Sequence, residues 1–328
     1  MHRLPIVRHL VLVTPALASA NNGNWQTARR WARLLAPAYR VTLTDHATPA
    51  QIEAADAMLA LHARRSAASI QAWREAHATR PLVVALTGTD LYRDIASDAD
   101  AQRSLVLADR LVVLNRHGAR ALPAPLDRKA RVVLQSCAAR QPLTKPLRHL
   151  RVLMVGHLRN EKDPQTVWRA IARLRHRADL RFDHIGGALD PLLGAEARAL
   201  AAADARFRWL GALPHAATRA RIQRAHLLVH ASRMEGGAHV VIEALRSGTA
   251  VLASAIDGNT GLLGDDHPGL FTPGDDTALA TLLERCRDEP AILPALRAAG
   301  DRQAPQFTPE AEAAALQALL AELLPPGS

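Results

Sequence analysis

Two glutamates and two glycines in the second half of the chain have the spacing of a ligand site. Glu235 directly precedes Gly236 and Gly237, and Glu243 lies eight positions after Glu235. The apolar run before Glu235 predicts a strand, and residues 238–248 have the spacing of a helix. Glycines at such a junction let the backbone approach a ligand, and the N–H groups that begin the helix favour an anion. Since carboxylates repel phosphates but accept hydrogen bonds from hydroxyls, the pattern predicts a nucleotide sugar with a sugar ring beside each glutamate.

The elements around this site alternate between short apolar runs and longer amphipathic stretches, which predicts parallel sheets covered by helices on both faces. A segment with two prolines at residues 139–150 predicts a linker, after which the alternation restarts. We therefore expect an α/β protein of two doubly wound halves. The strands predicted in the first half are 10–14, 41–44, 57–61, 82–86, 111–113 and 132–135, and those in the second half lie within 151–158, 180–187, 207–213, 226–232 and 249–258.

Composition excludes several classes of protein. The formal net charge is +10, but the arginines that supply it are scattered and aromatic residues make up only 3% of the chain. Nucleic-acid binding is therefore disfavoured, since it needs clustered basic residues interleaved with aromatics. No apolar run has the length of a membrane-spanning helix, so we expect no membrane insertion. Cys137 and Cys286 are the only cysteines, which suits a reducing compartment such as the cytoplasm.

The start of the chain allows two interpretations. Residues 8–23 have a basic start, a short apolar stretch and an Ala-Ser-Ala segment near the end, as a signal peptide does. We favour a buried first strand, a loop at Pro15–Asn24 and a helix, because Pro15 interrupts a short apolar stretch. Removal of residues 1–20 from the mature protein would instead favour a secreted or anion-binding protein that is not an enzyme.

The stretch "SRMEGGAHVVIEALRSGTAVLAS", residues 232–254, resembles the donor-site signature of retaining GT-B glycosyltransferases, which have two Rossmann-like domains facing a cleft. The resemblance implies that Lys162 in "VGHLRNEKDP" holds the donor diphosphate. His157 stands where the family has arginine, and we expect Arg159 to supply the missing charge. It also implies domains at 1–145, joined by a C-terminal helix at about 308–325, and at 146–307. The catalytic residues expected are Lys162, Glu235 and Arg159, and the donor-binding residues are His157, Gly211, Leu213, Gly236, Gly237, Ala238, Glu243, Gly258 and Asn259.

The N-terminal half is similar to a narrower family, the selenosugar synthases of the selenoneine pathway, through "GNWQTARRWARLL", "HARRSA", "LTGTDLYRDI" and "VVLQS". That resemblance implies that the enzyme transfers the sugar of a UDP-sugar to selenophosphate, and we expect the donor to be UDP-N-acetylglucosamine. It also implies that other enzymes of that pathway are partners. An anionic acceptor suits the polar and cationic residues expected at strand carboxyl ends. The acceptor-binding residues expected are Gly23, Asn24, His62, Arg64, Arg65, Thr87, Gly88, Thr89, Arg93, Gln135 and Ser136.

The anionic selenium of selenophosphate needs no general base, so stabilisation of the leaving UDP becomes the main catalytic task. We expect neither a metal nor a cofactor. Two other enzymes share the donor residues: a conventional glycosyltransferase with an alcohol acceptor on a lipid or glycan, and a UDP-sugar epimerase, which has no acceptor.

Overall fold

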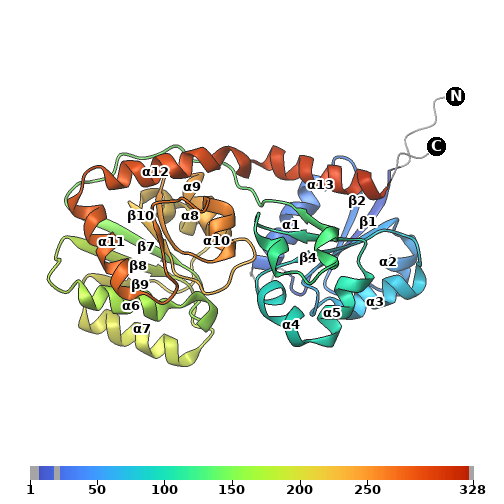
Figure 1. The fold of residues 1–328 in the computed structure, drawn as a ribbon, viewed down its shortest axis with the longest axis horizontal. Coiled ribbons are helices and arrows are strands. Elements are labelled where there is room, and N and C mark those ends of the chain that lie inside the picture. The colour runs from blue at the N-terminus through green and yellow to red at the C-terminus, as the bar shows by residue number, and fades with distance from the viewer. Residues whose placement is uncertain (1–6, 18–22, 325–328) are drawn as a thin grey trace. The chain divides into compact units, whose positions relative to one another are not determined.

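The structure, a computed structural model, describes residues 7–17 and 23–324 (Figure 1). It divides the chain into two compact units, each with its own sheet. Unit 1 comprises Met1–Ser136 and Pro309–Ser328, and unit 2 comprises Cys137–Thr308. The division thus falls just before the proline-containing segment in which we expected a linker. Residues 18–22, which include the Ala-Ser-Ala segment of the signal-like stretch and part of the expected loop at Pro15–Asn24, lie outside the described residues.

Unit 1 contains a six-stranded parallel sheet in the order β2-β1-β3-β4-β5-β6. The strand order reverses between β1 and β3, and ligands of open α/β sheets bind beyond the strand carboxyl ends at such a switch point. The strands are β1 His9–Val13, β2 Arg40–Thr44, β3 Ala57–Leu61, β4 Leu82–Leu86, β5 Arg110–Val113 and β6 Ala130–Val132. The helices are α1 Gly23–Leu35, α2 Pro49–Ala54, α3 Ala67–Ala76, α4 Ile95–Ser97, α5 Ala99–Leu107 and α13 Pro309–Leu323, with short turns η2 Asp90–Asp94, η3 Gly118–Ala121 and η4 Leu126–Lys129.

Alternate side chains of these strands pack on opposite faces of the sheet, as a period of two requires. Leu10 and Leu12 of β1 pack with Trp31 of α1 and Leu316 of α13, so the C-terminal helix completes the core of unit 1 (Figure 1). Glu312 of α13 is 1% exposed. Its carboxylate accepts hydrogen bonds from Trp31 Nε1 at 2.7 Å and Arg30 Nε at 2.8 Å. This buried, paired carboxylate fixes α13 against α1.

The strand predicted at residues 132–135 is displaced in the structure, where β6 ends at Val132. Gln135 Nε2 instead donates to Thr27 Oγ1 at 2.6 Å, and the backbone N–H of Ser136 donates to Glu312 at 2.9 Å. Beyond the last strand hydrogen bonds, the chain is therefore held by side chains of α1 and α13. An apolar run alone could not reveal these distant partners.

Unit 2 contains a second six-stranded parallel sheet, in the order β12-β11-β10-β7-β8-β9. This is the Rossmann order, with its switch point between β7 and β10. The strands are β7 Leu150–Val155, β8 Leu180–Ile185, β9 Phe207–Trp209, β10 Leu227–His230, β11 Ala250–Ser254 and β12 Leu270–Phe271. The helices are α6 Pro164–Arg173, α7 Pro191–Ala203, α8 His215–Arg224, α9 His239–Leu245, α10 Asp257–Leu263, α11 Asp276–Asp288 and α12 Ile292–Gln303, with turns η5 Asn160–Lys162 and η6 Ala304–Phe307.

One element near the expected ligand site differs from the prediction. The helix expected at 238–248 is only seven residues long, because α9 ends at Leu245 and Gly248 takes a left-handed φ of 63°. Residues 257–263, which include the expected donor-binding residues Gly258 and Asn259, form the short helix α10. Within 7–17 and 23–324, no helix combines the length and the apolar character needed to cross a bilayer.

Candidate functional site

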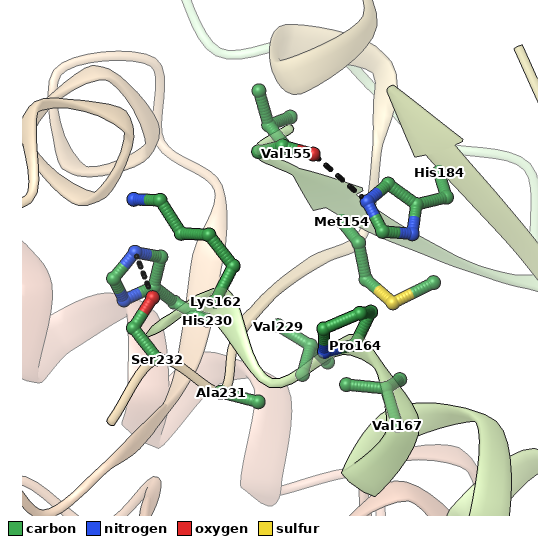
Figure 2. A pocket seen from close by; sticks show the side chains of 11 residues that line it. Met154, Val155, Lys162, Pro164, Val167, His184, Val229, His230, Ala231 and Ser232 are labelled. Atoms are coloured by element: carbon green, nitrogen blue, oxygen red, sulfur yellow. Dashed lines mark hydrogen bonds between the residues drawn. The ribbon is translucent and has the colours of Figure 1, made fainter. Parts of the chain in front are cut away.

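The candidate site of unit 2 lies at the switch point of its sheet, where β7 and β10 end. A cavity of about 20 Å³ opens between these strands and the start of α6 (Figure 2). Lys162, His184, His230 and Ser232 contribute its polar side chains, and Met154 and Val167 are among its apolar ones. The cavity is only large enough for a water molecule. Its position is nevertheless the one that Rossmann-type sheets use for ligands.

Lys162 reaches this site because the backbone turns sharply after it. Asp163 takes a left-handed conformation, with φ 42°, and its side chain caps α6 by accepting from the Thr166 N–H. Asp163 also accepts from Arg233 Nε at 3.0 Å. These contacts hold a conformation that non-glycine residues rarely adopt. They fix Lys162 at the end of η5, where its ammonium donates directly to Glu235 Oε1.

Glu235 is 9% exposed and has cationic and polar partners. Burial by itself would raise the pKa of this carboxyl, but Lys162 and His230 outweigh that effect and hold the pKa well below its usual range. Gly258 of α10 packs against the same residue. A Cβ atom at Gly258 would lie 2.0 Å from the Glu235 carbonyl oxygen. Only glycine permits this approach, so the start of α10 fixes the backbone of Glu235.

A histidine that sequence analysis missed stands beside Glu235. His230, at the end of β10, places Nε2 3.4 Å from Glu235 Oε1 and 3.3 Å from Ser232 Oγ (Figure 2). Its Nδ1 lies 2.9 Å from Asn259 Oδ1. Asn259, expected as a donor-binding residue, is fully buried and donates to Ser254 O at 2.9 Å. The only sequence signal for His230 was its position at the end of a predicted strand. That signal is weak, because a histidine at such a position is often a structural residue of the core.

Glu243 lies in α9 and is 4% exposed. It accepts from His215 Nε2 at 2.6 Å, with His239 Nδ1 at 3.4 Å and Arg219 at 3.9 Å. Burial would raise the pKa of Glu243, yet the hydrogen bonds from His215 and His239 hold it well below its usual range. Glu243 is thus an ionised hydrogen-bond acceptor, as a partner of sugar hydroxyls must be. Neither the two histidines nor Arg219 was predicted as a neighbour of Glu243.

His157 does not replace the expected arginine as a cation. Burial, with Arg159 and Lys162 nearby, lowers the pKa of His157. Its Nδ1 accepts from the Gly187 N–H at 3.1 Å, so the neutral ring keeps its hydrogen on Nε2. The Nε of Arg159 is buried and has no hydrogen-bond partner among the described residues. An unpaired buried donor of this kind suits an anionic ligand.

The remaining expected donor residues line the same end of the sheet. Gly211 has a left-handed φ of 65°, and its carbonyl accepts from the Gly186 N–H at 2.8 Å, which extends the pairing beyond β8. Leu213 and Gly237 are half-buried, whereas Gly236 and Ala238 are buried.

Unit 1 has its own polar cluster, beyond the carboxyl ends of β3 and β4. His62 has a φ of 72° and is 1% exposed. Its Nε2 lies 3.2 Å from Thr89 Oγ1. Burial lowers the pKa of His62, and the opposing effect of Asp90 does not cancel this. Asp90 is fully buried and accepts from the N–H groups of Ala63 and Thr87, at 3.0 and 2.7 Å. This carboxylate therefore ties the two loops together.

Asp94, which sequence analysis missed, organises two of the expected arginines. Its carboxylate accepts a hydrogen bond from Arg93 Nε at 3.1 Å and forms an ion pair with Arg64, whose Nε lies 2.9 Å from Asp94 Oδ2. The arginine side chains are 40% and 49% exposed, while Asp94 is 7% exposed. Each guanidinium thus binds the buried carboxylate through Nε. The neighbouring Arg65 is exposed.

The other expected acceptor residues have structural partners. Gly23 and Asn24 begin α1, and the Gly88 carbonyl accepts from the Tyr92 N–H at 3.1 Å. Gln135 and Ser136 are buried against α1 and α13 through the bonds described above. No group of three or more metal-ligating side chains occurs in the described part of the chain.

Residues 137–303, just over half of the chain, match the family described as glycosyl transferases group 1. The chain belongs to the glycosyltransferase group 1 family. It is therefore a glycosyltransferase, and its matched segment coincides almost fully with unit 2. No sequence among the curated proteins matches this chain.

Solved structures show the same GT-B fold over nearly the whole chain. Sucrose-phosphate synthase from Thermosynechococcus elongatus is 19% identical, with a TM-score of 0.77, and the alignment covers 96% of this chain and 99% of that one. HepE from Anabaena, in complex with UDP and glucose, is 16% identical, with a TM-score of 0.75 and coverage of 96% and 100%. A glycosyltransferase from Rickettsia africae is 13% identical, with a TM-score of 0.74 and coverage of 98% and 100%.

Proposed function

We propose that this glycosyltransferase transfers the sugar of a UDP-sugar, UDP-N-acetylglucosamine in the first instance, to selenophosphate, and so forms a carbon–selenium bond. The bond between the anomeric carbon and the diphosphate oxygen breaks, and its electron pair leaves with UDP. Selenium supplies the electron pair of the new bond. The two buried free cysteines fit a reducing compartment, and we propose the cytoplasm.

The observation that carries the donor part is the Lys162–Glu235 pair at the switch point of unit 2. A cation at this position can neutralise the charge that develops on a leaving diphosphate. Two ionised, buried carboxylates, Glu235 and Glu243, can accept hydrogen bonds from sugar hydroxyls. HepE, which has the same fold, was solved with UDP and glucose and with UDP-glucose. This set of groups supports a UDP-sugar donor.

The acceptor part is supported by the cluster in unit 1 and by the sequence resemblance. Asp94 holds Arg64 and Arg93 by their Nε atoms, and guanidinium groups fixed in this way are suited to bind a phosphate-like anion. His62 and Thr89 add a neutral, hydrogen-bonded pair beside them. An acceptor that is already anionic needs no general base.

The test is incubation of the purified protein with UDP-N-acetylglucosamine and selenophosphate, thiophosphate or no acceptor, followed by mass measurement of the products. We expect a selenium-linked sugar phosphate, or the selenosugar after loss of its phosphoryl group, together with equimolar UDP. Formation of an isomerised UDP-sugar in the incubation without acceptor would support an epimerase instead. Absence of any selenium- or sulfur-linked sugar would refute the acceptor that we propose.

An apolar groove in unit 1 favours a second candidate, a conventional glycosyltransferase with an alcohol acceptor that carries an apolar chain. The groove has a volume of about 630 Å³ and lies between η2, α4 and α5 on one side and η3 and η4 on the other. Leu91, Ile95, Leu105 and Leu122 are among its lining residues. Transfer of the sugar to a lipid-linked alcohol, in a parallel incubation without selenophosphate, would support this candidate.

A further inference from the structure

His230 and Asn259 form a buried, hydrogen-bonded pair beside Glu235, and no role has been given above to His230 or to the contact between the two residues. Asn259 is fully buried and His230 is 3% exposed. The Asn259 amide nitrogen donates to Ser254 O at 2.9 Å and to Ser254 Oγ at 3.1 Å, so its oxygen faces His230 Nδ1, 2.9 Å away. An amide oxygen can only accept hydrogen bonds. Asn259 therefore holds a hydrogen on His230 Nδ1.

The second nitrogen of the same ring faces a carboxylate. His230 Nε2 lies 3.4 Å from Glu235 Oε1, with Ser232 Oγ at 3.3 Å as its other neighbour (Figure 2). An ionised carboxylate also only accepts, so a favourable contact with Glu235 requires a proton on Nε2. With both nitrogens protonated, the ring donates to Asn259 at one end and makes a charge-assisted contact with Glu235 at the other.

Glu235 needs this second partner because Lys162 has two tasks. Lys162 donates directly to Glu235, and the proposed function also assigns it to the donor diphosphate. A diphosphate at that place draws the ammonium away from Glu235. The carboxylate is 9% exposed and would then be a buried charge without a cation, which is costly.

We propose that Asn259 and His230 position the Glu235 carboxylate for the donor sugar. Asn259 fixes the ring through Nδ1, and the proton at Nε2 holds Glu235 in place while Lys162 contacts the diphosphate. His230 and Asn259 are thus positioning residues for the sugar half of the donor. This inference rests on the donor part of the proposed function.

Two amide substitutions at His230 separate positioning from mere packing. In His230→Gln the terminal nitrogen reaches the place of Nε2 and can donate to Glu235, whereas in His230→Asn it reaches the place of Nδ1 and can donate only to Asn259. We expect kcat with UDP-N-acetylglucosamine to fall at least about tenfold in His230→Asn, as loss of a charge-assisted hydrogen bond implies, and clearly less in His230→Gln.

Thermal stability should rank the two variants in the opposite order, with His230→Asn more stable than His230→Gln. His230→Gln leaves the buried Asn259 oxygen without a donor, so its thermal midpoint should lie below that of His230→Asn. A purely structural histidine would give the same order for stability and activity. Equal activities of the two variants, or lower activity in His230→Gln, would overturn the proposal.

The binding of UDP provides the second readout, because UDP contains ribose but lacks the transferred sugar that Glu235 is proposed to contact. Inhibition by UDP should change less than about twofold in His230→Asn, well below the change expected for a lost hydrogen bond. His226, one residue before the start of β10, is the matched control. It is buried, and its two nitrogens bond Arg151 N and Pro146 O, each at 3.0 Å. His226→Gln should lose stability but keep the kcat of the native enzyme.

Nitrogen NMR of the native enzyme tests the pair independently of turnover. We expect His230 to show a protonated Nδ1 whose signal shifts in Asn259→Ala, and a protonated Nε2 when UDP-N-acetylglucosamine is added. If the native enzyme neither binds nor uses a UDP-sugar, the proposed function fails, while the Nδ1 signal still reports on the Asn259 contact. A native enzyme that uses UDP-N-acetylglucosamine with Nε2 unprotonated would refute the positioning role alone.

Discussion

Gly258→Ala should damage the donor site through the backbone of Glu235. The added Cβ would lie 2.0 Å from the Glu235 carbonyl oxygen, 2.7 Å from its Cβ and 2.8 Å from its carbonyl carbon. Since carbon and oxygen atoms that are not bonded stay about 3 Å or more apart, the Glu235 loop or α10 must move by about 1 Å. A displacement of about 1 Å at a catalytic site can lower the rate roughly 100-fold. We therefore expect kcat/KM for the UDP-sugar to fall by roughly 100-fold, because the Glu235 side chain moves with its backbone.

The assay needs a control that is equally overpacked but leaves Glu235 alone. Gly269→Ala provides it, since its Cβ would lie 2.4 Å from the Val251 carbonyl oxygen in the same unit. Both variants should lose about 1–3 kcal/mol of unfolding free energy, the usual cost of overpacking. Urea unfolding and steady-state kinetics on both variants decide the matter. Similar kcat/KM values in the two variants would show that Gly258 acts through stability only, and an unchanged value in Gly258→Ala would refute the close approach itself.

Four further outcomes are expected. Lys162→Ala should lower kcat more than it raises KM for the donor, because charge on the leaving phosphate grows in the transition state; a change in KM alone would contradict this. Glu243→Ala should weaken UDP-sugar binding in calorimetry by roughly 1–3 kcal/mol, and unchanged affinity would remove Glu243 from the site. Arg65→Ala should raise KM for selenophosphate and leave UDP binding intact, whereas no change would favour an alcohol acceptor. Burial lowers the pKa of His226 to about 4 from 6.5, so the unfolded chain binds more protons between these pH values and stability falls as pH drops below 6.5. His226→Gln should reduce the loss between pH 7 and pH 5, measured by urea unfolding, by about 2 kcal/mol.

The pattern of apolar runs determined most of the architecture before any tertiary contact was known. Strands β3 and β4 begin and end where the sequence places them, because buried parallel strands are apolar throughout and polar residues end them. The Glu-Gly-Gly stretch likewise predicts a ligand site at the end of β10, since glycines beside a strand end let the backbone approach a ligand. Both features depend on near neighbours in the sequence.

The features that the sequence missed depend on partners far along the chain. β6 ends early because Gln135 and Ser136 bind residues of α1 and of α13, more than 100 positions away in each case. The sequence predicts Gly258 as a donor-binding residue, and only the fold shows that the Glu235 carbonyl oxygen occupies the place of a side chain there.

The charges of the site were also decided by the tertiary structure. From residue types alone, Glu235 and Glu243 could be surface carboxylates, and His230 was one more histidine in an apolar run. Folding buries both glutamates, sets Lys162 and His230 beside Glu235, and sets His215 and His239 beside Glu243. The sequence alone therefore predicted Lys162, Glu235 and Glu243 as donor-site residues, but not the histidines that lie beside the two glutamates. The tertiary structure decided which of these side chains interact with one another. Burial and distance set the strength of electrostatic interactions, and neither can be read from neighbouring positions in the sequence.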